Sequence, residues 1–229
     1  DIRTPGEWKE SGVLKDAIPI MFFDEQGRYI NSAHIGALLA TQMLEETPAS
    51  NFIYTVFTSR RYQEAVEENG GKAYKARVGH AYIKQMMRKH DAIFSCEHSA
   101  HFYFKDNYYA DSGLFVLLYL VRAYQKARES DMSFSELLSP YTNYFQTEEV
   151  MVEVGDKEAV LAAVAKEYES ASSVTVTKFD GVSISAPEYW FSIKKSVTED
   201  VLKFVVEAPV KKTALAKQKE VKALLQSLA

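Results

Sequence analysis

Apolar and polar positions in the first 130 residues predict strands that alternate with helices. Strand-like runs at residues 52–57, 72–77 and 93–94 are separated by segments with helical spacing, and residues 18–30 predict a strand, a turn and a strand. One segment places Ile35, Leu38 and Met43 on one helical face. The alternation predicts an α/β layer with largely parallel strand pairing.

The pattern changes after residue 140. Residues 150–154 alternate as a half-buried strand, and a helical stripe follows at 157–168. Four more strand-like runs follow, at 174–178, 182–184, 190–194 and 201–207. The final helix is predicted at 213–228. We therefore expect two domains: an α/β domain with a mixed sheet and flanking helices over 1–143, and a small antiparallel α+β domain over 144–229. We expect residues 1–17 to be an extension of the first domain or the relic of a metal-binding loop.

For two helices the sequence pattern predicts which face is buried or exposed. The most hydrophobic helix follows Gly113 and ends near Arg128, and we expect its stripe of Leu114, Leu117, Leu118 and Val121 to be core. In the last helix we expect a solvated face, formed by Lys211, Lys212, Lys217, Lys219 and Lys222.

Composition excludes several classes of protein. Of 229 residues 47% are hydrophobic, and the net charge is −4 with Lys and Arg spread along the chain, which argues against nucleic-acid binding. The apolar run at 114–121 is too short to cross a bilayer, and the first six residues lack the apolar stretch of a signal peptide. A single cysteine forms no internal disulfide. These features predict a cytoplasmic protein that contacts neither membrane nor nucleic acid.

The densest chemistry lies in residues 96–101, which read Cys-Glu-His-Ser-Ala-His. An apolar run precedes this segment and the aromatic residues 102–104 follow it. A carboxylate, a hydroxyl and imidazoles within six residues are suited to a polyhydroxylated ligand.

The order of these residues resembles the α-D-phosphohexomutases, the phosphomannomutase/phosphoglucomutase group. The third domain of that family carries Gly-Glu-x-Ser-Gly-His as its sugar loop, and residues 24–27 and 78–84 resemble two further segments of that domain. Asp180-Gly-Val182 and the segment 190–202 resemble the signature of its fourth domain, which grips phosphate. The resemblance covers residue 18 to the C-terminus and implies the last two domains of such an enzyme.

The resemblance implies a set of site residues. Glu97, Ser99 and His101 would contact sugar, His80 would meet a phosphate, and the phosphate loop would use Lys194, Ser196 and Thr198. Each assignment has an alternative: the residues at 97–101 face solvent in a relic loop, and His80 caps a helix. Cys96 is a reactive thiol only if a histidine lowers its pKa, and otherwise it is inert. We expect His34 and His90 to be surface residues.

Several motifs of the family are changed here. Cys96 and Ala100 replace glycines, which predicts another loop path. Of the acidic metal loop only Asp16 survives, so Mg²⁺ is implied by resemblance alone and no cofactor is expected. Phe57 stands where a lysine is expected, and the family's Ser-His-Asn-Pro phosphoserine loop is missing from this sequence. Asp200 adds a like charge, which at about 6 Å from a phosphate costs on the order of 2–3 kcal/mol.

Three functions remain open on this basis. The chain binds a hexose phosphate as half of a mutase whose catalytic half is supplied upstream or in trans, without catalytic residues of its own. Alternatively it is a non-catalytic interaction or regulatory module with a protein partner. An unrelated hydrolase using Glu97 or Cys96 with a histidine is the third reading.

Overall fold

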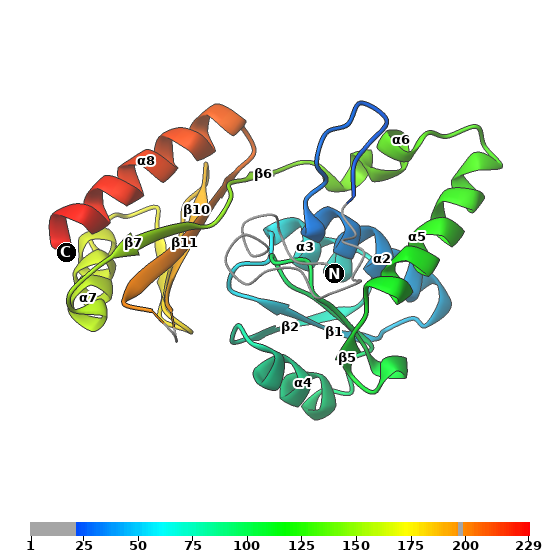
Figure 1. Ribbon diagram of the computed structural model, residues 1–229, viewed down its shortest axis with the longest axis horizontal. Coiled ribbons are helices and arrows are strands. Elements are labelled where there is room, and N and C mark those ends of the chain that lie inside the picture. Colours follow the sequence, from blue (N-terminus) through cyan, green and yellow to red (C-terminus); the bar gives the residue numbers. More distant parts are fainter. Residues whose placement is uncertain (1–21, 197–198) are drawn as a thin grey trace, which may run out of the picture. The chain divides into compact units, whose positions relative to one another are not determined.

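The computed structural model describes residues 22–196 and 199–229, and the chain divides after Asn143 into two compact units (Figure 1). Each unit has its own sheet and its own hydrophobic core. The metal-loop remnant at residues 14–19, the start of the first predicted strand, and Val197 and Thr198 lie outside the described residues.

The first unit places helices between short strands, as the sequence pattern predicts. Its elements are α2 (Ser32–Glu46), β1 (Asn51–Thr55), α3 (Arg60–Glu68), β2 (Lys72–Ala76), α4 (His80–Lys89), β3 (Phe94–Cys96), β4 (Phe102–Phe104), the 3-10 helix η1 (Lys105–Asn107), β5 (Ala110–Asp111), α5 (Gly113–Arg128), α6 (Phe134–Leu138) and the 3-10 helix η2 (Ser139–Tyr141). The helix boundaries follow from caps: the side chain of Asn31 accepts a hydrogen bond from the amide of Ala33, and Ser112 caps α5 in the same way.

The sheet of the first unit has the order β2-β1-β3-β4-β5. β1 runs parallel to β2 and β3, whereas β4 returns antiparallel to β3 and β5 antiparallel to β4. The predicted mixed sheet with flanking helices is confirmed, but the expectation of largely parallel pairing holds for only two of the four pairs. The difference arises because short connections at residues 97–101 and 105–109, instead of helical crossovers, join β3 to β4 and β4 to β5.

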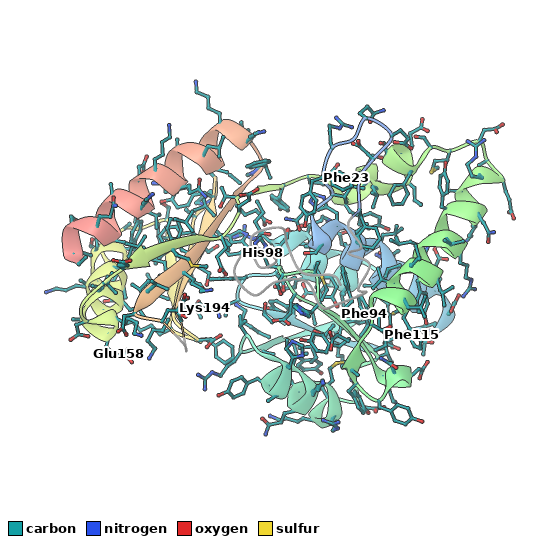
Figure 2. The ribbon with its side chains drawn as sticks, viewed as in Figure 1. Phe23, Phe94, His98, Phe115, Glu158 and Lys194 are labelled. Carbon is teal, nitrogen blue, oxygen red and sulfur yellow. The ribbon has the colours of Figure 1, made fainter. Side chains whose placement is uncertain are left out.

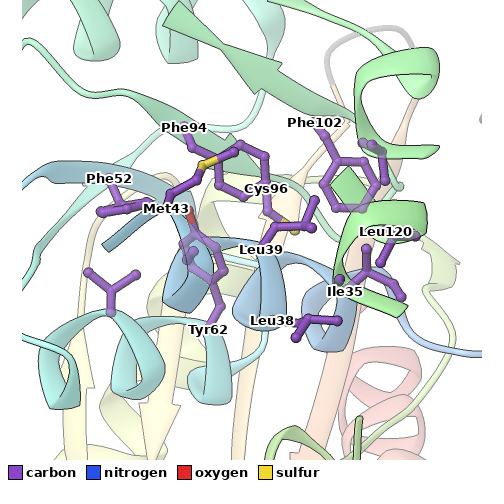
Figure 3. Packing of buried hydrophobic residues seen from close by; sticks show 14 of the residues in the cluster. Ile35, Leu38, Leu39, Met43, Phe52, Tyr62, Phe94, Cys96, Phe102 and Leu120 are labelled. Atoms are coloured by element: carbon purple, nitrogen blue, oxygen red, sulfur yellow. The ribbon is translucent and has the colours of Figure 1, made fainter. Parts of the chain in front are cut away.

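Alternating side chains of the sheet supply two cores. On one face, Phe52 and Phe94 pack with apolar side chains of α2 and α3 in the buried cluster that Figure 3 shows. Ile53 and Tyr103 point to the other face, where they pack against Ile83 of α4. Figure 1 shows α4 on the opposite side of this sheet from α2 and α3.

One predicted core stripe is wrong. In α5 the side chains of Leu114, Leu117, Leu118 and Val121 are exposed, by 60%, 39%, 59% and 46%. The helix instead buries its other apolar positions, which are Val116, Leu120, Ala123 and Ala127. Both sets have helical spacing, so periodicity alone does not decide which of them faces the sheet.

The first described residues form a small turn. Of the strand, turn and strand predicted over residues 18–30, the described part retains one antiparallel bridge between Phe23 and Tyr29. The carboxylate of Glu25 accepts hydrogen bonds from the backbone amides of Phe134 and Ser135 at the start of α6, at 2.6 and 3.2 Å. This contact ties the turn to a segment more than 100 residues away in the sequence.

The second unit is the predicted antiparallel α+β fold. Its elements are β6 (Phe145–Gln146), β7 (Val150–Glu153), α7 (Lys157–Glu169), β8 (Thr175–Thr177), β9 (Val182–Ser185), β10 (Trp190–Lys195), β11 (Val201–Ala208) and α8 (Lys211–Leu228). The sheet order is β6-β11-β10-β9-β8, β7 also pairs with β11, and every pair is antiparallel. Apolar side chains of α7 and α8 pack on the sheet in one core.

The helices can be compared with two predictions from the sequence, the exposed lysines of the last helix and the lack of a membrane-spanning segment. The lysines of α8 are exposed except Lys217, which is half-buried with its ammonium 4.4 Å from the centre of the Tyr189 ring. In the described part of the chain, every helix is too short or too polar to cross a membrane.

Candidate functional site

The candidate site lies at the carboxyl edge of the sheet in the first unit. Glu97 directly follows β3, and His80 is the first residue of α4, which begins shortly after the end of β2. Because β1, β2 and β3 are parallel, their carboxyl ends meet at one edge, where α/β proteins commonly bind ligands.

The loop at residues 97–101 is anchored by hydrogen bonds. The amide of Glu97 donates to the carbonyl of His101 at 2.9 Å, and the buried Ser32 hydroxyl reaches the carbonyls of Glu97 and His98 at 3.0 and 2.9 Å. Ala100 has a φ of 62°, the left-handed conformation that glycine adopts more readily. The loop therefore keeps a glycine-like turn at this position, at the cost of some strain in an alanine.

Cys96 is seated in the core below this loop. Its side chain is fully buried, and an added Cβ at Gly36 of α2 would lie only 2.7 Å from the sulfur (Figure 3). Burial, followed by the nearby Glu97 carboxylate, raises the pKa of the thiol well above its usual value. The reactive-thiol alternative is therefore wrong, because neither histidine lowers this pKa.

Glu97 is the central charged group of the site. Its side chain is almost completely buried, and the Tyr103 hydroxyl donates a hydrogen bond of 2.7 Å to one of its carboxylate oxygens. Burial and the adjacent carboxylate raise the pKa of Tyr103, which keeps this phenol protonated as a donor. A buried carboxylate held from one side can present its other oxygen to a ligand.

Two histidines and a serine complete the cluster. His80, Glu97 and His101 each offer a ligand atom within 4.8 Å of the other two. The ring of His101 lies 4.9 Å from that of His80, and its Nδ1 is 2.9 Å from the Ser99 hydroxyl. The Nδ1 of His80 lies 3.6 Å from a carboxylate oxygen of Asp111 in β5. The N-cap of α4 is Gly79, so His80 does not cap this helix.

The remaining histidines lie elsewhere. His90 follows α4 and stacks on Tyr74 with 3.9 Å between ring centres, and His34 is half-buried in α2. Neither is the plain surface residue that the sequence predicts. Phe57 stands at the position where the resemblance implies a lysine. Its buried ring packs edge to face against His98, with 6.4 Å between the ring centres, so this position holds an aromatic contact in place of a lysine ammonium.

The second unit holds the other predicted site residues at the end of β10. Lys194, labelled in Figure 2, is half-buried in that strand. The next residue, Lys195, forms an ion pair with Glu158 of α7. Ser196 is buried, and its amide donates to the carbonyl of Val201 at 3.0 Å. Thr198 lies outside the described residues.

Two features of this unit modify the sequence interpretation. The carboxylate of Asp200 is paired with the ammonium of Lys157 at 3.1 Å, which offsets part of the repulsion expected between Asp200 and a phosphate. Gly181 has a φ of 113°, and an added Cβ would lie 2.0 Å from the carbonyl oxygen of Ile193 and 2.9 Å from the Cα of Lys194. The Asp180-Gly-Val182 segment is thus packed directly beside Lys194.

The chain is similar in sequence and in fold to known proteins. Residues 31–144 match the family model described as phosphoglucomutase/phosphomannomutase, alpha/beta/alpha domain III. A phosphomannomutase of Methanocaldococcus jannaschii is 32% identical over 90% of this chain, and one of Escherichia coli is 34% identical over 89%. A solved phosphoglucomutase/phosphomannomutase family protein of Burkholderia thailandensis superposes with a TM-score of 0.72, at 26% identity and over 88% of this chain. This chain belongs to the α-D-phosphohexomutase superfamily.

The chain spans only part of such a phosphohexomutase. It covers 44% of the length of both curated relatives and 43% of the solved structure. The two units correspond to domains III and IV of the superfamily fold, as the resemblance implies.

The structure brings together the four site residues predicted for the first unit, which are His80, Glu97, Ser99 and His101. It adds Tyr103 and Asp111, which the sequence analysis did not select. Tyr103 is the middle residue of β4, between Phe102 and Phe104. Because successive side chains of a strand point to opposite faces, the sequence could have indicated that Tyr103 faces away from both phenylalanines. Asp111 pairs with Tyr103 across the sheet, a register that the sequence does not reveal.

Proposed function

We propose that this chain is the sugar-phosphate-binding half of a phosphohexomutase-type protein and does not isomerise sugar phosphates alone. The observation that carries the proposal is the buried Glu97 carboxylate, fixed by Tyr103 and flanked by His80 and His101. The superfamily membership supports it, because the relatives from Methanocaldococcus jannaschii and Escherichia coli are phosphomannomutases.

The chemistry of the first unit suits sugar hydroxyls. A carboxylate accepts two hydroxyl hydrogen bonds at once, and imidazole and serine groups both donate and accept. Hydrogen bonds to a charged group contribute about 1.5–3 kcal/mol each, more than those between neutral groups. We therefore assign the main hydroxyl contact to Glu97, with secondary contacts from Ser99, His101 and His80.

The second unit would supply the phosphate contact. Lys194 gives a positive charge, and Ser196 and Thr198 give hydroxyl donors, although a lysine lacks the two-pronged geometry of arginine. The packing of Gly181 against the end of β10 supports a defined position for Lys194. We expect weaker phosphate binding here than in a loop that carries arginine.

Calorimetric titration with mannose and glucose 1-phosphates and 6-phosphates tests the proposal. Glu97→Gln keeps the size of the side chain and an acceptor for Tyr103, yet removes the charge, so we expect about 10- to 100-fold weaker binding. Glu45→Gln is the matched control, because Glu45 is exposed and forms a surface ion pair with Lys126. Absence of heat at millimolar ligand, or equal affinity in the Glu97 variant and the wild type, would overturn the assignment.

Lack of mutase competence needs its own assay. Only Asp16 remains where the family's metal loop is expected, and no sequence of the phosphoserine type precedes it in this chain. We therefore expect no conversion of mannose 1-phosphate to the 6-phosphate with Mg²⁺ and a bisphosphate activator, followed by ³¹P NMR. Sustained turnover by the purified chain would contradict this part of the proposal.

A second candidate function is a cytoplasmic interaction or regulatory module. The exposed apolar face of α5 favours it, because Leu114, Leu118 and Val121 lie open to solvent on one helix. A protein partner, such as a catalytic half supplied in trans, would cover this face. Size-exclusion chromatography with light scattering of the chain mixed with that half tests it: a complex that Leu118→Glu abolishes supports the module, and no complex counts against it.

A further inference from the structure

We propose that His80, Glu97 and His101 form a binding site for a late first-row divalent cation, with Zn²⁺ the best match. The three residues come from the start of α4 and from the loop after β3, and one nitrogen or oxygen of each lies within 4.8 Å of the others. Two imidazoles and one carboxylate form a donor set that leaves a fourth position open to water or another ligand.

The spacing is compatible with closure on a metal. Bonds of about 2.0–2.2 Å in a tetrahedron place ligand atoms about 3.3 Å apart, so the three groups must approach one another by about 1.5 Å or less. His80 can supply most of this movement, because its side chain is 51% exposed and belongs to the first residue of its helix. Glu97 is buried and stays nearly fixed.

Each ligand is supported by a second group that leaves a donor atom available. Tyr103 donates a hydrogen bond to one oxygen of Glu97, and a cation would bind the other oxygen, to which no hydrogen bond is seen within residues 22–196 and 199–229. The Ser99 hydroxyl lies 2.9 Å from Nδ1 of His101 and can accept a hydrogen bond from it in the tautomer that carries the proton on Nδ1 and offers Nε2 to the cation. Asp111 lies 3.6 Å from Nδ1 of His80 and can stabilise the same tautomer there. Support of this kind orients metal-binding histidines and strengthens their donor atoms.

The donor set also selects the cation. Mg²⁺ prefers an octahedron of oxygen ligands, and this cluster offers a single carboxylate. Imidazole suits Zn²⁺, Ni²⁺ and Cu²⁺, and a tetrahedral site with one open position suits Zn²⁺ best. The inferred metal is therefore distinct in chemistry from the Mg²⁺ that the family resemblance implies for another segment.

Metal and sugar phosphate would share Glu97 and His101. This consequence rests on the proposed function: a bound cation occupies the oxygen assigned to a sugar hydroxyl, so Zn²⁺ and hexose phosphate would compete. Metal binding itself rests only on the cluster geometry, so the two ideas can fail separately.

Competition titration against a chromophoric zinc chelator measures the binding directly. We expect one Zn²⁺ per chain, and at least tenfold weaker binding in His80→Asn and in His101→Asn. His90→Asn is the matched control, because His90 stacks on Tyr74 away from the cluster. With Co²⁺ in place of Zn²⁺, the intense visible absorption of a tetrahedral ion should appear and should be lost in both cluster variants.

The outcomes separate the possibilities. Lack of stoichiometric Zn²⁺ binding, or the same affinity in His80→Asn and wild type, overturns the metal site. His80 is exposed, so His80→Asn is expected to fold, and circular dichroism checks this. If Zn²⁺ binds as expected but leaves hexose phosphate binding unchanged, the metal site stands and the sugar assignment of Glu97 fails. If sugar phosphate binds and Zn²⁺ does not, only the metal site fails.

Discussion

The contact between Gly36 and Cys96 gives a prediction that can be worked out quantitatively. Replacing Gly36 by alanine would place a Cβ 2.7 Å from the sulfur and 2.8 Å from the Cβ of Cys96, and 3.1 Å from a ring carbon of Tyr62. Carbon atoms pack best at about 3.5–4.0 Å, so helix α2 or strand β3 must shift. Overpacking of this kind costs about 1–3 kcal/mol.

The helix preference of alanine partly masks this cost. Alanine is favoured over glycine within a helix by about 1 kcal/mol, so Gly36→Ala alone should lower the free energy of unfolding by 0 to about 2 kcal/mol. In a Cys96→Gly background the clash with Cys96 is gone, and the same substitution should stabilise. The double-mutant cycle isolates the steric term, for which we expect about 1–3 kcal/mol.

Urea unfolding followed by far-ultraviolet circular dichroism provides the four free energies of the cycle. Gly155→Ala in the second unit is the control, because a Cβ there meets no atom within 4 Å. An interaction energy within error of zero would refute the packing of Cys96 against α2.

Three further predictions concern burial and charge. Cys96 should resist a thiol reagent at pH 8 in the folded protein and react fully in urea; fast labelling when folded would contradict its burial. Leu120→Ala should cost about 2–5 kcal/mol, whereas Leu118→Ala should change unfolding by less than about 0.5 kcal/mol; equal losses would refute the assignment of faces in α5. The hydroxyl and backbone amide of Ser135 lower the pKa of Glu25 from 4.5, so its stabilising contribution is complete above that pH and is lost as pH falls through the lower folded value. Melting temperatures between pH 6 and 3 should therefore fall less in Glu25→Gln; an unchanged pH dependence would exclude this contact.

Local signals in the sequence predicted most helices and strands. The limits of α2 follow from Asn31 and from the helical spacing that starts at Ile35. The face of α5 was predicted wrongly because apolar residues line both sides of that helix, and the choice depends on what the rest of the fold covers. Propensity and periodicity describe one element at a time and carry no information on such a choice.

The site was predictable only where its residues lie in segments that resemble motifs of the family, as His80 and the loop at residues 97–101 do. Glu97, Ser99 and His101 lie in one loop, and the resemblance of that loop to the sugar loop of the family identified them. Tyr103 and Asp111 join the site through the pairing of β4 with β5, and burial of Glu97 depends on packing between distant elements. Long-range pairing of this kind requires the folded structure.

Amide chemical shifts of ¹⁵N-labelled protein test the central claim most directly. On titration with mannose 1-phosphate, the amides of residues 97–101 should shift and saturate in the wild type, and the shifts should largely disappear in Glu97→Gln. Inorganic phosphate alone should leave this loop unchanged. Shifts confined to the lysine-rich α8, or no shift of the loop at millimolar ligand, would contradict sugar-phosphate binding at Glu97.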